Sequence, residues 1–157
     1  MIAASAIPVF TDALVATWTA ALGSDLVFDG PGVGDDTPPA YVLVGVDDPD
    51  GEVLGIAAES SQTWAWLGHV QRDEIGSVRC AIVSWSGETD MKAARDAAFA
   101  LLADLASAVE ADPSLGTDQP SWFTGVDSLS YRQEQDANGA ICVIMFSVGF
   151  HARVSAS

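Results

Sequence analysis

Apolar residues recur at helical spacing in two parts of the chain. In residues 5–22 they return every three or four positions, and residues 88–111 show the same period over a longer stretch. Ser5 can cap the first segment, and either Thr89 or Asp90 can cap the second. The pattern therefore predicts an N-terminal helix and one long central helix.

Other segments have the composition of strands. Residues 25–30 predict a short strand, and residues 41–46 predict a strand that is apolar on both faces and so internal to a sheet. Residues 60–87 are typical of a long antiparallel hairpin. Within it, the polar stretch 72–76 is the expected turn, with Gly76 available for a positive φ.

A second hairpin is predicted over residues 124–154. Its turn is expected at 136–139, where Asn138-Gly139 is a strong hairpin signal. The return strand, 140–154, is apolar on both faces at first and on one face later. This change indicates a central strand that emerges toward an edge of the sheet.

These elements together predict the class of fold. The order is helix, strands, hairpin, helix, hairpin, within 157 residues that suffice for one core. We expect a single α+β domain over residues 1–157. Its mixed or antiparallel sheet, with two long hairpins, packs against an N-terminal helix and one long central helix.

The charge of the chain excludes some partners. Twenty-two acidic residues against six Lys and Arg give a formal net charge of −16. Such a surface repels nucleic acids and anionic membranes, and no apolar run is long enough for a membrane span. The acidic surplus is explained either by solubility or genome composition, or by a surface that must lie near DNA without binding it.

The stretch 45–59, GVDDPDGEVLGIAAE, superficially resembles a calcium loop. With Gly51 at loop position 6, Asp48 and Asp50 fall at positions 3 and 5, but Val46 and Ala57 occupy positions 1 and 12, where acidic ligands are needed. A strand, not a helix, is expected before it. The sequence therefore predicts a turn here and no metal site.

Other chemical signals are equally weak. Cys80 and Cys142 lie in apolar runs, so we expect two buried free thiols in preference to a disulfide. The spacing of these cysteines with His69 and His151 is not that of a zinc site. The stretch VSWSG, 83–87, lacks the first glycine of a nucleophile elbow. We therefore expect no enzymatic activity, no metal and no cofactor.

The order of motifs resembles a known family. Residues 71–116, the turn at 44–51 and the ending at 131–154 are similar to tail terminator proteins of long-tailed phages with non-contractile tails (siphoviruses), especially those of actinobacterial hosts. The resemblance begins near residue 5 and rests on motif order, without a catalytic signature.

The resemblance implies a structural virion protein in the neck region of the tail, assembled in the host cytoplasm. Such a protein forms a homohexameric ring on the tail tube, ends tube polymerisation and joins the tail to the head. Its implied partners are its own copies, the major tail tube protein and the head–tail connector protein. DNA passes through the ring without specific binding, and the resemblance implies no cofactor, no enzymatic activity and no membrane.

Two groups of residues are candidates for these roles. The first group would form the subunit interface and comprises Trp64, Trp66, His69 and Arg72. Its two tryptophans are expected on the same side of a strand, and they could equally be core residues. The other would line an acidic channel and comprises Asp35, Asp36, Asp47, Asp48, Asp50 and Glu52. The polar loops 30–39 and 112–121 are candidates for contact with the tube or connector.

Two alternative functions remain open from the sequence. One is a small cytosolic α+β binding or regulatory domain. The other is a serine hydrolase that uses Ser84 or Ser86.

Overall fold

The fold is a six-stranded mixed sheet with two helices. The computed structural model describes residues 4–32, 37–51, 54–68 and 70–155. The expected α+β class is confirmed. In chain order the elements are α1 (Ile7–Leu22), β1 (Val27–Asp29), β2 (Ala40–Val44), β3 (Ala58–Trp64), β4 (Gln71–Ser86), α2 (Met91–Ala111), β5 (Gly125–Asp136) and β6 (Gly139–Ser155).

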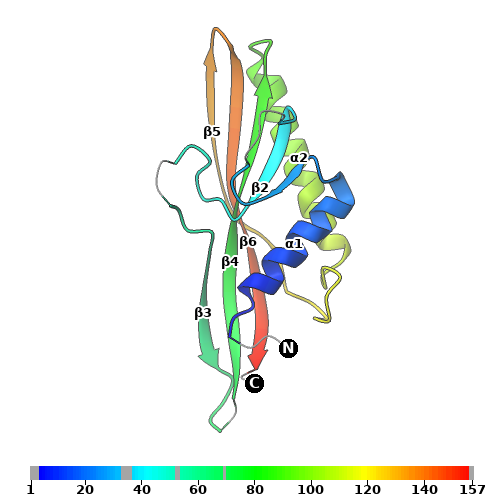
Figure 1. Ribbon diagram of the computed structural model, residues 1–157, viewed down its shortest axis with the longest axis vertical. Coiled ribbons are helices and arrows are strands. Elements are labelled where there is room, and N and C mark those ends of the chain that lie inside the picture. The colour runs from blue at the N-terminus through cyan, green and yellow to red at the C-terminus, as the bar shows by residue number, and fades with distance from the viewer. Residues whose placement is uncertain (1–3, 33–36, 52–53, 69, 156–157) are drawn as a thin grey trace.

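Two long strands, β4 and β6, form the centre of the sheet. The strand order is β1-β2-β4-β6-β5, and among the strands of the described residues only the β1–β2 pair is parallel. β6 pairs with β4 along its whole length. On the other side of β4, β2 pairs with its second half and β3 with its first half. The β3–β4 hairpin therefore extends the sheet beyond the part that β2 reaches (Figure 1).

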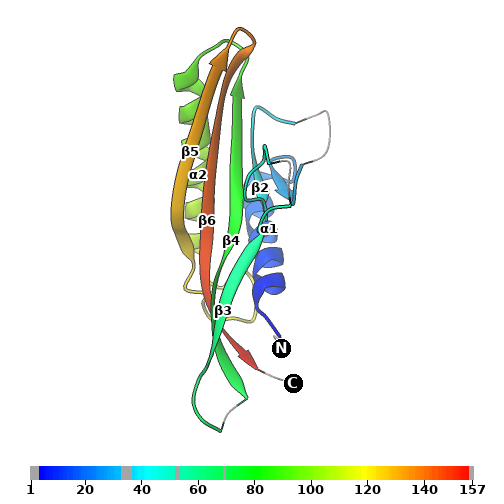
Figure 2. The same ribbon diagram turned by 90° about the vertical axis from the view of Figure 1, so that its left-hand side faces the viewer.

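Both helices cover the same face of the sheet. Figure 2 shows the opposite face toward the viewer, with α1 and α2 behind the strands. Trp18 of α1 is buried and donates from Nε1 to the Leu105 carbonyl of α2 at 3.0 Å, which ties the helices together. Helix and strand side chains share one large buried cluster, which includes Phe10, Ile82 and Ile144.

The helix ends show which caps operate. α1 begins at Ile7 after Ala6, and the Ser5 hydroxyl accepts a hydrogen bond from the Ile7 N–H at 3.1 Å. At the start of α2, Asp90 is the capping residue, since its carboxylate accepts from the Ala93 N–H at 3.1 Å. A capping carboxylate satisfies a backbone donor that has no partner within the helix.

The second hairpin forms where the sequence predicted it. β5 and β6 pair from Asp136 and Gly139 at the turn back to Gly125 and Gly149. Past Gly149, β6 keeps only β4 as a partner. The expected change from a central strand to an edge is therefore present in the last residues of β6.

The turn of the first hairpin was predicted wrongly. The structure places the connection between Trp64 and Gln71, where the Ala65 N–H donates to the Gln71 carbonyl at 3.0 Å, and not at 72–76. Glu74 lies inside β4 and is fully buried, so its polarity does not mark a turn.

Gly76 also has a role other than the one predicted. It lies within β4, where a Cβ would stand 2.7 Å from the Glu59 carbonyl oxygen and 2.8 Å from the Phe150 ring. Glycine is required here for close approach between strands, not for a turn.

Candidate interaction surface at the end of the β3–β4 hairpin

The end of the β3–β4 hairpin exposes large apolar side chains. We call residues 64–68 and 70–72 the hairpin end. It lies beyond the start of α1, where neither helix covers the strands (Figure 2). Trp64 is 67% exposed, Trp66 53%, Leu67 101% and Val70 62%. Apolar groups gathered this closely on a projecting element are typical of a protein interaction site.

Two arginines stack on the tryptophans from different sides. The Arg72 guanidinium lies 5.8 Å from the Trp64 ring, and the Arg153 guanidinium lies 5.7 Å from the Trp66 ring. Each distance is in the range of a cation–π contact. Arg72 is opposite Val154 in the β4–β6 register, and paired residues point to the same face of a sheet. Arg153 is the neighbour of Val154 along β6, so its side chain points to the other face.

The two tryptophans are therefore on opposite faces of the hairpin, and the expectation that they share one side was wrong. Period-two alternation applies only within a strand, and β3 ends at Trp64, so Trp66 already belongs to the turn. Neither tryptophan is a core residue. His69, the remaining candidate of this group, lies outside the described residues.

A buried carboxylate fixes the base of the hairpin. Glu74 accepts hydrogen bonds from the Ser60 hydroxyl of β3 at 2.6 Å, the Ser5 hydroxyl at 2.7 Å and the Ala6 N–H at 2.6 Å. These donors come from β3 and from the segment that leads into α1. One side chain thus joins both strands of the hairpin to the first helix.

The charge on Glu74 is stabilised by these donors. Burial by itself raises the pKa of Glu74, but the hydrogen bonds from Ser60, the Ala6 N–H and Ser5 outweigh it, and the pKa falls below its usual value. The carboxylate is therefore ionised at neutral pH although it is inaccessible to solvent. No local pattern around Glu74 indicates this role, because its donors are distant along the chain.

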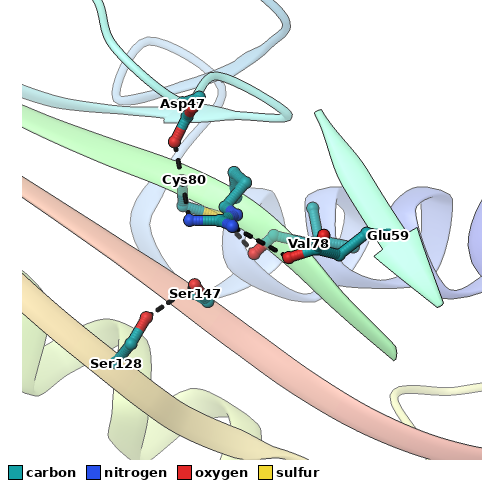
Figure 3. Close-up of polar contacts among 7 residues, drawn as sticks. Asp47, Glu59, Val78, Cys80, Ser128 and Ser147 are labelled. Atoms are coloured by element: carbon teal, nitrogen blue, oxygen red, sulfur yellow. Dashed lines mark hydrogen bonds and ion pairs between the residues drawn. The ribbon is translucent and has the colours of Figure 1, made fainter. Parts of the chain in front are cut away.

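The described acidic candidates lie in one loop and contact arginines. Asp47 lies 3.6 Å from the Arg79 guanidinium, which also contacts Glu59 of β3 at 2.8 Å. In Figure 3, Asp47 approaches from the loop that follows β2, and Glu59 approaches from β3. Asp48 and Asp50 both contact Arg132 of β5, at 2.7 Å and 3.3 Å.

The remaining acidic candidates, Asp35, Asp36 and Glu52, lie outside the described residues. The described acidic candidates have a structural role. Their arginine partners hold the loop that follows β2 over the helix-free face of the sheet (Figure 1). Their part in a channel stays a prediction.

The acids that resemble part of a calcium loop contact an arginine. A backbone hydrogen bond from Asp50 and a side-chain hydrogen bond from Arg132 lower the pKa of Asp48. The cation that these acids contact is the Arg132 guanidinium. Over the described ranges, no three His, Cys, Asp or Glu side chains gather as metal ligands would.

A pocket of about 420 Å³ lies beneath this loop. We call it the loop pocket. Its apolar floor comes from three neighbouring strands and consists of Tyr41, Leu43, Val83, Ile141 and Val143. Asp47, Asp48 and Asp50 form part of its acidic rim. An apolar floor with a few polar groups at the rim is the usual composition of a binding pocket.

Ser84, one of the two serines of the hydrolase alternative, is poorly placed. Ser84 is buried, and β4 continues past it to Ser86, so no sharp turn presents its hydroxyl. His151 is opposite Ile75, nine positions along β4 from Ser84, which is about 30 Å. Cys80 and Cys142 are free and buried, as expected, and burial raises the pKa of Cys80 to about 12.

One of the two polar loops is described only in part, and the other is described along its whole length. Part of 30–39 lies outside the described residues. The segment 112–121 is organised by Asp112, whose carboxylate accepts from the Ser114 and Gly116 N–H groups at 3.0 and 2.9 Å. Their contacts with other proteins stay predictions.

Among the helices described, none has the length and apolar character of a membrane span.

Comparison with known proteins finds a likeness in fold only. No family model matches the chain, and no curated protein matches it by sequence. Among solved structures, it is similar to a chain in the virion of a native gene transfer agent particle, with a TM-score of 0.52 and 12% sequence identity. The match covers 96% of this chain and 100% of that chain. At this identity the likeness establishes a shared fold.

Proposed function

We propose that this chain is a structural protein of a phage-type virion. The observation that carries the proposal is the fold likeness to a gene transfer agent virion chain, which extends over almost the full length of both. The match leaves no part of that chain uncovered.

Within that class, we propose a tail terminator that caps the tail tube as a hexameric ring and joins the tail to the head connector. A ring requires a heterologous contact, in which one patch of a subunit binds a different patch of the next. The hairpin end supports this role, because it projects away from the helices and exposes Trp64, Trp66 and Leu67. Tryptophan and arginine are enriched in the parts of interfaces that contribute most to affinity.

The acidic surplus supports passage of DNA through such a ring. A net charge of −16 disfavours binding to phosphate groups. A duplex could therefore move through the bore without being held. The tail tube protein and the connector would then contact opposite sides of the ring.

Native mass spectrometry of the purified protein tests this proposal. A hexamer, or a mixture of monomer and hexamer that shifts with concentration, is the expected result. Negative-stain images should show closed annuli of uniform diameter. A protein that stays monomeric at all accessible concentrations, and does not associate with purified tail tubes, would rule out the terminator role.

The loop pocket favours a second candidate, a small α+β binding domain. Its volume of about 420 Å³ lies within the range of small-molecule sites. The same mass spectra distinguish the two functions. A binding domain would appear as one subunit carrying a small ligand.

A further inference from the structure

We propose that the loop pocket is the acceptor for the hairpin end of a second copy of this chain. This inference rests on the proposed function, because it assigns the second half of the contact that closes the ring. The occupant of the pocket would be the hairpin end, with one of its exposed apolar side chains, Trp64, Trp66 or Leu67, seated on the apolar floor.

The two surfaces match in apolar character. The pocket floor is built from Tyr41, Leu43, Val83 and two β6 residues, and its volume of about 420 Å³ lies in the range that holds a drug-sized ligand. One bulky aromatic side chain fits within that space. The exposed side chains of the hairpin end are of this kind, and burial of a large aromatic ring contributes strongly to association.

The two surfaces also match in charge. Arg72 and Arg153, two of only six basic residues in the chain, lie against the tryptophans of the hairpin end. The pocket rim carries Asp47, Asp48 and Asp50. In a chain with a net charge of −16, most pairs of surfaces repel each other. The three rim acids share two arginines, Arg79 and Arg132, and Arg153 is paired with Asp73 at 2.8 Å. The cation that this contact brings to the acidic rim is therefore Arg72.

The hairpin end cannot occupy the pocket of its own subunit. Ala57 lines the pocket, and β3 then runs from Ala58 to Trp64, away from it, over about 20 Å. The β3–β4 register and the Glu74 hydrogen bonds hold this strand straight against β4. The donor and acceptor surfaces are thus separate on one subunit, which is the arrangement that a heterologous contact requires.

The test uses two variants, each with a matched control. The pocket variant is Ala57→Trp, which places an indole at an exposed position on the pocket lining. Its control is Ala97→Trp, the same change at an exposed position of α2. The hairpin variant is W64A/W66A, and its control is Tyr131→Ala, which removes a half-exposed aromatic ring from β5. Circular dichroism melting confirms that each variant is folded.

Light scattering and native mass spectrometry then report the self-association. We expect each variant alone to raise the dissociation constant at least tenfold, while both controls associate as the unmodified chain does. Mixing the two variants should give a two-subunit species. One member keeps its pocket and the other its hairpin end, so the pair forms one contact and cannot extend.

Each contrary result has a separate meaning. If Ala57→Trp forms unmodified rings while W64A/W66A does not, the acceptor lies elsewhere and this inference fails, although the terminator role stands. If the folded variants stay monomeric when mixed, the pairing of these two surfaces is also refuted. If the unmodified chain never self-associates, the inference and the ring proposal fail together.

Discussion

Arg132 donates to Asp48 at 2.7 Å, although 84 residues separate the two in the sequence. Arg132 lies on β5, at an edge of the sheet, and Asp48 lies in the loop that follows β2. The ion pair therefore spans the helix-free face of the sheet and holds the loop over the pocket. It gives this loop a fixed position that its own turn residues do not provide.

Replacement of Arg132 by Met should release the loop. Asp48 and Asp50 would lose their shared cation, and the pKa of Asp48 should return toward its usual value. Limited proteolysis should then cut within residues 45–57 faster than in the unmodified chain, with little change in melting temperature because exposed ion pairs contribute little to stability. Lys92→Met, which breaks an exposed pair on α2, is the control and should leave this cleavage unchanged.

Glu74→Gln should destabilise the protein at neutral pH and change how stability depends on pH. The pKa of Glu74 is lowered on folding, so its contribution is fully present above the unfolded-state pKa of about 4.3 and is lost as pH falls through the folded-state value. Hydrogen bonds to a charged group contribute on the order of 1.5–3 kcal/mol each, so a loss of about 2 kcal/mol is expected at pH 7.

Urea denaturation at a series of pH values between 7 and 3 measures this effect. The difference in unfolding free energy between the two proteins should shrink steadily toward low pH. A constant difference at every pH would mean that the carboxylate charge is not what stabilises the base of the hairpin.

Gly76→Ala should destabilise the sheet. The new Cβ would stand 2.7 Å from the Glu59 carbonyl oxygen and from the Ser60 Cβ, so the β3–β4 ladder must separate locally. A cost of about 1–3 kcal/mol is expected for such overpacking. Gly125→Ala, where nothing lies within 4 Å of the new Cβ, is the control and should be neutral or slightly stabilising. Equal melting temperatures for the two variants would contradict the close approach.

The acidic loop can be tested for a role in DNA passage. In a virion that carries this protein, the triple change D47K/D48K/D50K should slow genome ejection if the loop lines the channel, because the lysines would attract phosphates. The triple change to Asn breaks the same arginine contacts without adding positive charge. If both triple variants slow ejection equally, the effect comes from a displaced loop and not from its charge. If the lysine variant ejects its genome at the normal rate, the loop does not line the channel.

The elements that sequence predicts well here are those whose signal is local. The period of α2 and the Asn138-Gly139 turn depend on residues close together in the chain, and the structure contains both. The turn of the first hairpin failed for a physical reason. Glu74 and Gly76 have the composition of a turn, but one is satisfied by distant donors and the other permits close strand approach.

The candidate site was predictable only in part. The tryptophans of the hairpin end could be selected as interface residues by their type, but their opposite faces depend on where β3 ends. The contacts of Arg132 and Arg79 with the loop acids are long-range pairings that no spacing predicts. These pairings join the loop above the pocket to β4 and β5.

The continuity of β4 has a mechanical consequence. Sixteen register pairs join it to β6, from the hairpin end through to the part covered by the helices. A pulling force on the hairpin end would have to shear this ladder along its length instead of separating its pairs one at a time. The hairpin end would then transmit such a force directly to the core of the protein.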